Sequence, residues 1–117
     1  LRRAGLDYWH SLDIFYYDSL EDFMSKCGKY PFFCFSSKAP RAYTDIKYPS
    51  PVFLMFGKET KGLDEAFLYE NEEKCVRIPM LQGSRCLNLS NAAAVAVYEV
   101  LRQSGFENFK ISGSMAD

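Results

Sequence analysis

The stretch from residue 74 to residue 105 constrains the fold of this chain more than any other. Residues 75–78 (CVRI) are β-prone, and Pro79 ends the run because proline cannot donate to a sheet ladder. A loop of small and polar residues follows over residues 81–89, and the remainder is helical. A strand, a polar loop and a helix start in this order predict a ligand site.

The helix of this stretch is unusual at its start. Ser90 or Asn91 is the expected N-cap, and Gly105 is the expected C-terminal stop. Residues 92–97 (AAAVAV) are apolar on every side, whereas a helix on a protein surface has one apolar stripe. We therefore expect this segment to be buried all round or packed between two partners.

The rest of the chain alternates strands and helices. Three segments are expected as strands: residues 12–17, 31–35 and 51–56. The last two are apolar runs too short for helices, which is typical of buried strands. Two segments are expected as helices: residues 18–27, which Gly28 ends, and residues 63–69. This alternation predicts an α/β domain with a mostly parallel sheet and helices on both faces.

Composition narrows the class of protein. A length of 117 residues, with 48% hydrophobic and 16% aromatic residues, indicates one packed domain. The net charge of −1 gives no global basic field, so a nucleic-acid partner would need a local patch or a groove between subunits. No apolar run reaches the roughly 18 residues of a membrane span, and no signal peptide is present. We expect a cytoplasmic protein.

The four cysteines do not form a metal-binding pattern. Cys27, Cys34, Cys75 and Cys86 contain no Cys-x-x-Cys pair, and the single histidine, His10, is distant in sequence. We expect no metal site. The first three cysteines lie in apolar segments, which favours buried thiols over a disulfide framework. The fourth lies in the polar loop.

Three loops are expected at one edge of the sheet: the loop after Phe35, residues 57–62 and residues 79–89. In a parallel sheet, ligands bind beyond the carboxyl ends of the strands. Gly57 and Gly62 would let backbone amides approach a ligand, although they fit equally well as turn and helix-start glycines. The spacing matches neither the dinucleotide-binding fingerprint nor the P-loop.

Three motifs become specific when they are taken together. They are residues 54–63 (LMFGKETKGL), 77–80 (RIPM) and 84–91 (SRCLNLSN). Their order and spacing resemble the knotted SPOUT methyltransferases of the SpoU class. The opening residues 1–8 (LRRAGLDY) look like the TrmL-like tRNA (cytidine/uridine-34) 2′-O-methyltransferases. The resemblance covers essentially all 117 residues as a single SPOUT domain.

The resemblance implies a fold and a cofactor. The fold includes a C-terminal trefoil knot, in which the chain after Met80 threads through an earlier loop. The cofactor is S-adenosyl-L-methionine, bound by the three loops. The residues that match the family's cofactor contacts are Phe35, Gly57, Ile78, Cys86 and Leu87. Together with Met80, the apolar side chains of this set would suit an adenine ring.

Several polar residues near this expected site keep two interpretations. Arg85 is the candidate for contacting RNA, through a phosphate, or the cofactor carboxylate; alternatively it is a solvated loop arginine. Glu59 could face the sulfonium or could complement the dipole of the following helix. Asn88, Ser90 and Asn91 could be helix caps and nothing more.

The implied activity is 2′-O-methylation of the ribose of the wobble nucleotide in a tRNA anticodon loop. The family's first motif, Asn-Thr-Gly-Asn-x-x-Arg, has no counterpart here, and its arginine is the residue proposed to help activate the ribose hydroxyl. We therefore name no catalytic residue. Because the chain starts inside an element, we expect that an N-terminal part is missing. The alternative function is a catalytically inactive dimeric module that binds cofactor or RNA.

The implied partners are tRNA and a second copy of the chain, joined through the C-terminal helix. The family's RNA site spans both subunits, so five basic residues could form a composite surface: Arg2, Arg3, Lys38, Arg41 and Arg85. Scattered solvated charges are the alternative. Stacking on an unpaired base would need exposed aromatic rings, for which three residues are candidates: Tyr8, Trp9 and Tyr43. These aromatic residues could equally belong to the core.

Overall fold

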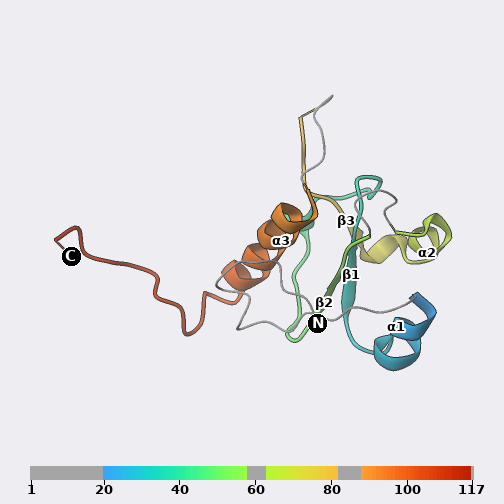
Figure 1. The fold of residues 1–117 in the computed structure, drawn as a ribbon, viewed down its shortest axis with the longest axis horizontal. Helices are drawn as coiled ribbons and strands as arrows, with labels where there is room; N and C mark the ends of the chain where they lie inside the picture. The colour runs from blue at the N-terminus through green and yellow to red at the C-terminus, as the bar shows by residue number, and fades with distance from the viewer. Residues whose placement is uncertain (1–19, 58–62, 82–87, 117) are drawn as a thin grey trace. The chain divides into compact units, whose positions relative to one another are not determined.

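The structure is a computed structural model that describes residues 20–57, 63–81 and 88–116 (Figure 1). The chain divides into two compact units, Leu1–Pro31 and Phe32–Asp117. The first contains helix α1 (Leu20–Cys27), and the second contains the sheet and the other helices. The strand expected at residues 12–17 lies outside the described residues.

Helix α1 ends where the sequence predicted. Its first turn carries Glu21 and Asp22 and its last turn Lys26, so the charges complement the helix dipole. The backbone N–H of Gly28 donates to Met24 O at 3.0 Å. A Cβ atom at position 28 would lie 2.5 Å from Met24 O, so only glycine fits this stop.

The described sheet has three parallel strands in the order β2-β1-β3. They are β1 (Phe32–Phe35), β2 (Phe53–Met55) and β3 (Cys75–Val76). The central strand holds the core, with Phe32 and Cys34 only 2% and 0% exposed. The parallel sheet is confirmed. The strand expected at residues 51–56 is confirmed as β2, but its expected burial is wrong, since β2 lies at an edge of the described sheet and is half-buried throughout.

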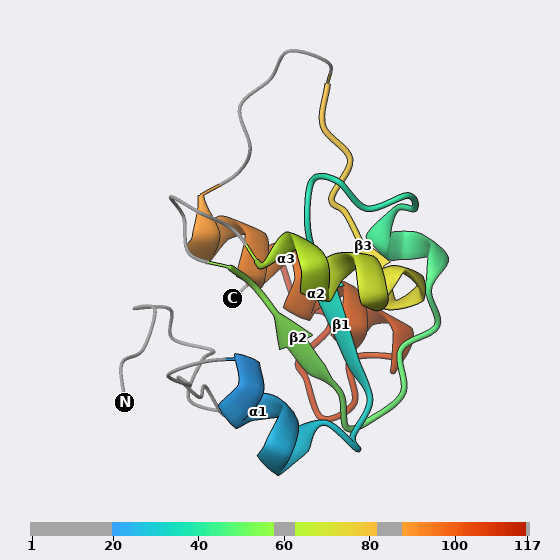
Figure 2. The same ribbon diagram turned by 90° about the vertical axis from the view of Figure 1, so that its right-hand side faces the viewer.

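Helices cover both faces of the sheet, as the sequence predicted. Figures 1 and 2 show α2 (Glu65–Glu70) on one face and α3 (Leu89–Gln103) on the other. The ring of Phe32 stacks against Phe67 of α2, with centroids 6.2 Å apart. Helix α2 starts at Glu65 because Asp64 caps it, accepting from the N–H of Phe67 at 3.0 Å. A short 3-10 turn, η3 (Glu72–Lys74), then leads into β3.

The prediction for the start of α3 is wrong, and the prediction for its end is confirmed. The expected N-caps, Ser90 and Asn91, are wrong, because the Asn88 side chain accepts from the N–H of Asn91 at 2.9 Å and the helix starts at Leu89. The stop at Gly105 is confirmed. Its φ of +81° is a left-handed conformation, and Gly105 N donates to Arg102 O while the next N–H reaches back to the carbonyl of residue 101.

The start of α3 is not buried all round within one chain. Ala96 is 1% exposed, whereas the other residues from 92 to 97 are half-buried. The sheet of one chain can cover only one side of a helix, so packing between two partners stays a prediction. In the part of the chain that the structure describes, no helix is long and apolar enough to cross a membrane.

Candidate functional site

Three of the predicted cofactor contacts follow the strands at one edge of the sheet. Phe35 ends β1 and pairs with Val76, the last residue of β3. Gly57 follows β2 by two residues, and Ile78 follows β3 by two residues. Because the strands are parallel and in register, Phe35, Gly57 and Ile78 lie at their carboxyl ends, where ligands bind in open α/β sheets.

An aromatic wall borders this edge. The ring of Phe35 stacks on Phe56, with centroids 4.9 Å apart and planes 22° apart. Tyr43 approaches the same ring at 6.3 Å and 60°. Phe35, Phe56 and Gly57 are all half-buried, so part of their surface remains accessible. A half-exposed aromatic surface beside a glycine can accommodate a planar apolar group such as a nucleobase.

The loop that follows β1 is bound to the end of β3. The N–H of Arg77 donates to Arg41 O at 3.0 Å, and the N–H of Tyr43 donates to Arg77 O at 2.8 Å. Ala42 and Arg77 form an isolated parallel bridge. The guanidinium of Arg77 also donates to Ser37 O at 3.0 Å. The loop therefore runs alongside the chain as it leaves the sheet.

Two residues of the expected basic surface make contacts within the protein. Arg41 donates through Nη1 to Glu72 O and Cys75 O, both at 2.9 Å, and so satisfies one carbonyl in η3 and one in β3. Lys38 pairs with Glu65 of α2 on the surface. For Arg41 these contacts favour a structural role. Arg2, Arg3 and Arg85 lie outside the described residues.

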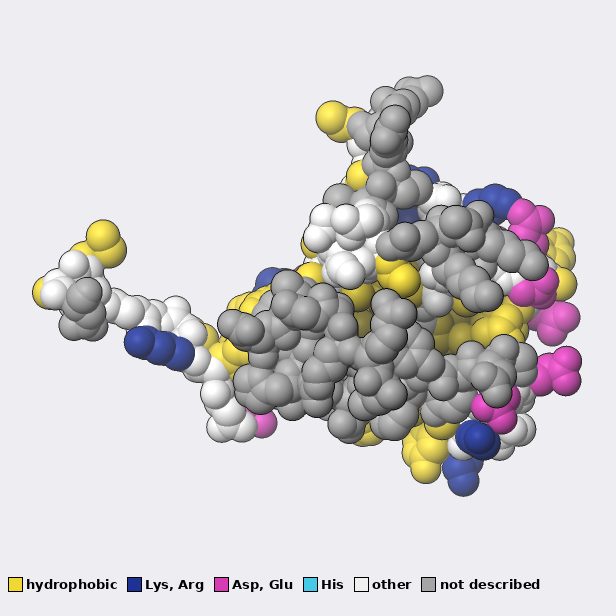
Figure 3. All heavy atoms as spheres, in the orientation of Figure 1, with side chains coloured by type: hydrophobic (Ala, Val, Ile, Leu, Met, Phe, Trp, Pro, Cys, Tyr) yellow, Lys and Arg dark blue, Asp and Glu magenta, His cyan; other side chains and the backbone are white. Residues whose placement is uncertain are grey.

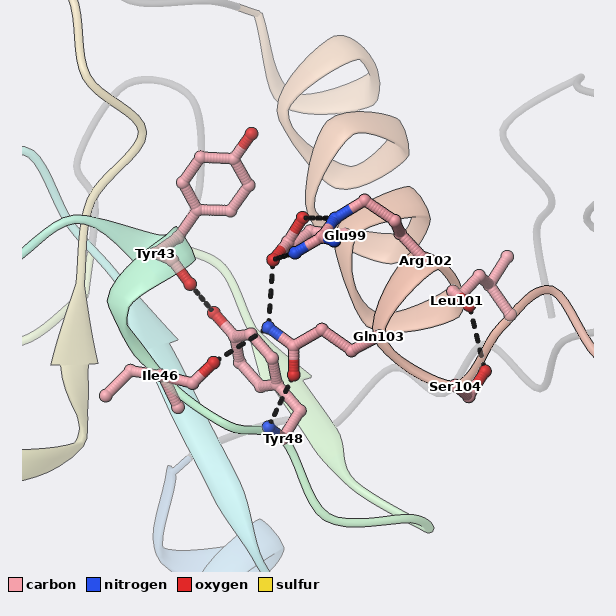
Figure 4. A network of polar contacts seen from close by, with 8 residues as sticks. All are labelled: Tyr43, Ile46, Tyr48, Glu99, Leu101, Arg102, Gln103 and Ser104. Atoms are coloured by element: carbon pink, nitrogen blue, oxygen red, sulfur yellow. Dashed lines mark hydrogen bonds and ion pairs between the residues drawn. The ribbon is translucent and has the colours of Figure 1, made fainter.

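A polar network joins the last turn of α3 to residues 43–48 (Figure 4). The side chain of Gln103 donates to Ile46 O at 2.8 Å and accepts from the N–H of Tyr48 at 2.9 Å. It also donates to Glu99, which is 7% exposed and forms two 2.9 Å hydrogen bonds with Arg102. These bonds from Arg102 hold the pKa of Glu99 below its usual value. Burial raises the pKa of Tyr48, whose hydroxyl donates to Tyr43 O at 2.6 Å.

The sequence analysis missed this network. The one local signal is the spacing of Glu99 to Arg102 and Gln103, at three and four residues, which places the three side chains on one helix face. Nothing in the sequence links that face to residues 46–48, because the contact spans more than fifty positions.

The cysteines of the sheet are buried, as predicted. Cys34 and Cys75 are partners in the β1–β3 register and are 0% and 3% exposed. Burial raises the pKa of Cys34 to about 12 and also raises that of Cys75. The thiol of Cys75 donates to Asn71 O at 3.3 Å. Cys27 is half-buried. The two sheet thiols therefore serve packing and not chemistry.

The structure does not describe the remaining predicted site residues. Glu59, Arg85, Cys86 and Leu87 lie outside the described residues, so their roles stay predictions. Within the described ranges, no group of three or more His, Cys, Asp or Glu side chains could hold a metal ion.

A parallel sheet with helices on both faces is typical of α/β proteins, which bind ligands at the carboxyl edge where Phe35, Gly57 and Ile78 lie. The model of the SpoU rRNA Methylase family matches residues 1–98. This match covers most of the chain, and the chain belongs to that family. The resemblance deduced from the three sequence motifs is confirmed.

A curated relative and two solved structures support the family assignment. A putative tRNA (cytidine(34)-2′-O)-methyltransferase of Geobacillus stearothermophilus is 48% identical over 109 residues, which are 91% of this chain and 69% of the relative. The crystal structure of a putative RNA methyltransferase from Bacillus anthracis superposes with a TM-score of 0.77 at 39% identity, covering 94% of this chain and 71% of that one. A structure concerned with 2-OH methylation of C/U34 on tRNA gives 0.72 at 34% identity, covering 89% and 64%. This chain thus spans 64% to 71% of their lengths.

Proposed function

We propose that this chain catalyses S-adenosyl-L-methionine-dependent 2′-O-methylation of the ribose at the wobble position of a tRNA anticodon loop. The observation that carries the proposal is the convergence of Phe35, Gly57 and Ile78 at one sheet edge. These residues match the cofactor contacts of the family through its motifs. The 48% identity to a relative named for this reaction supports the choice of substrate.

The proposed cofactor site extends this edge by Cys86 and Leu87, with Arg85 directed to the RNA. The half-exposed Phe35–Phe56 stack fits a purine ring, and Gly57 leaves room for a close backbone approach. When bound, S-adenosyl-L-methionine supplies a methyl group that the ribose 2′-oxygen attacks. In this transfer the 2′-oxygen would give up its proton as it bonds to the methyl carbon, and the cofactor would leave as a neutral thioether. The residue that accepts the proton is unassigned.

The proposal includes three further features of the protein. The chain forms a trefoil knot after Met80, two copies form a homodimer through α3, and the protein is cytoplasmic. The half-buried surface of residues 92–97, which are apolar on every side, supports the dimer, since a second copy would cover the exposed part. Substituting Ala94 by arginine would place a charge there. We expect this variant to be monomeric in light scattering, whereas the unmodified chain is dimeric.

The proposed tRNA surface avoids the side of the molecule that carries α2. Figure 3 shows acidic side chains on that side, and exposed acidic residues lie in the helix and next to it in sequence: Asp64, Glu65, Glu70, Glu72 and Glu73. Carboxylates repel the phosphate backbone of a nucleic acid.

The inactive-module alternative is not favoured, since the relatives are named as methyltransferases.

The test is transfer of a labelled methyl group from S-adenosyl-L-methionine to tRNA transcripts. We expect incorporation into a transcript with cytidine or uridine at the wobble position. The matched control is the same tRNA with a 2′-O-methyl group already present at that nucleotide, which we expect to accept no label. Saturable cofactor binding without any transfer would instead support the inactive module.

A further inference from the structure

Arg77 bonds with both ends of the loop that follows β1. Its backbone N–H and C=O bind Arg41 and Tyr43 at the far end of the loop, as the isolated bridge at Ala42 reflects. Its guanidinium donates to Ser37 O at 3.0 Å at the near end. Any residue at this position could make the backbone bonds, whereas only a long donor side chain reaches Ser37.

The hydrogen bond of the Arg77 guanidinium joins two residues that are each close in sequence to a predicted cofactor contact. Ser37 comes two residues after Phe35, and Arg77 comes immediately before Ile78. The two bonded residues are 40 positions apart in sequence, so the bond ties the end of one strand to the end of another. A second link runs parallel to it, because Ser36 N donates to Val76 O at 3.0 Å.

We propose that Arg77 is a positioning residue that fixes the loop of residues 36–43 for cofactor binding. The inference rests on the proposed function, because it takes the carboxyl edge of the sheet as the cofactor site. Arg77 acts through Ser37 and holds the loop in its binding conformation. Without this bond the loop around Ser37 is held only by backbone hydrogen bonds, and the remaining ordering that the cofactor has to supply costs affinity.

The hydrophobic core does not depend on this side chain. Arg77 is half-buried, and the largest fully buried side chains among the described residues, Phe32, Cys34 and Val76, belong to the strands. The backbone bonds between residues 77 and 41–43 also remain when the side chain is shortened. The fold should therefore survive the loss of the guanidinium.

The expected effect concerns cofactor affinity alone. A hydrogen bond from a charged donor to a carbonyl corresponds to roughly a tenfold change in an equilibrium constant. We expect Arg77→Ala to raise the Kd and KM for S-adenosyl-L-methionine about tenfold. The kcat at saturating cofactor and the KM for tRNA should stay within about twofold of the unmodified chain. Arg77→Lys keeps a donor and should restore part of the affinity.

The experiment is calorimetric titration of the full chain with S-adenosyl-L-methionine, with steady-state kinetics on tRNA. Lys47→Ala is the matched control, because it removes an exposed positive charge from the same connection between β1 and β2. We expect this control to bind cofactor as the unmodified chain does. If Arg77→Ala does not fold, Arg77→Met replaces it, since it preserves the backbone bonds and a long side chain but has no N–H donor.

The possible results distinguish a failure of this inference from a failure of the proposed function. Equal cofactor affinity in Arg77→Ala and the unmodified chain would overturn the positioning role and leave the methyltransferase proposal intact. A raised KM for tRNA with unchanged cofactor affinity would also overturn it, because Arg77 would then contact RNA. Failure of the unmodified chain to bind S-adenosyl-L-methionine would instead count against the proposed function itself.

Discussion

Tyr48 donates its backbone N–H to the side-chain oxygen of Gln103 at 2.9 Å, across 55 positions of sequence. The amide nitrogen of the same glutamine donates to Ile46 O at 2.8 Å. One side chain of α3 thus pairs with the backbone on both sides of Lys47, much as a neighbouring strand would. The hydroxyl of Tyr48 donates to Tyr43 O, and the N–H of Tyr43 donates to Arg77 O. Hydrogen bonds therefore connect the helix to the candidate site.

Replacing Gln103 by alanine should destabilise the protein. Two backbone groups and the Glu99 carboxylate would lose a partner, so we expect the free energy of unfolding to fall by about 1–3 kcal/mol. Urea denaturation measures the change. Ser104→Ala is the control, since that exposed hydroxyl bonds only within its own helix turn and its loss should cost under about 0.5 kcal/mol. Equal losses in the two variants would mean that water replaces the glutamine amide.

The stability of the protein should depend on Glu99 in acid. Hydrogen bonds from Arg102 lower the pKa of this carboxyl below its usual 4.5, so the folded state binds fewer protons than the unfolded chain as the pH falls. The stabilisation is complete above about pH 4.5 and is lost as the pH falls through the lowered native pKa. Unfolding free energies between pH 7 and pH 3 should therefore decline less steeply in Glu99→Gln. The exposed Glu70→Gln variant should follow the unmodified chain; a parallel decline in all three would exclude Glu99 as the cause.

Local chemistry was sufficient to predict much of the fold. The short apolar runs identified β1 and β2, and the glycines at 28 and 105 ended α1 and α3 where expected. The rule that ligands bind at the carboxyl ends of parallel strands predicted that three loops meet at one edge of the sheet, and the family resemblance named Phe35, Gly57 and Ile78 there. These successes share one property: each depends on neighbours in sequence or on the direction of the strands.

Contacts between distant segments could not be predicted. Asn88, Ser90 and Asn91 are all competent caps, and only the backbone geometry selects Asn88. Arg41 looked like a surface cation, but the carbonyls it binds belong to residues 72 and 75. The half-burial of β2 depends on its place at the edge of the described sheet, which hydrophobicity does not reveal.

The two sheet thiols should be unreactive in the native protein. Cys34 and Cys75 are buried, and burial raises the pKa of both thiols, which disfavours the reactive thiolate. We expect iodoacetamide to alkylate neither residue until the protein is unfolded in guanidinium, as peptide mass spectrometry would record. Half-buried Cys27 serves as the internal control and should react earlier. Rapid native labelling of Cys34 would show that β1 and β3 separate readily.

Removing the ring of Phe35 should weaken cofactor binding beyond its effect on stability. Phe35 stacks on Phe56 at the candidate site, whereas Phe33, two residues earlier on the same face of β1, packs edge-on against Tyr48 at 5.1 Å. Both alanine variants should lose roughly 1–3 kcal/mol of stability, because both rings are half-buried. The Kd for S-adenosyl-L-methionine should rise about tenfold or more in Phe35→Ala, because a stacking surface for the base is lost. In Phe33→Ala it should stay within about twofold. If both variants bind the cofactor equally, the carboxyl end of β1 does not form the adenine wall, and the cofactor must be held by the other two loops.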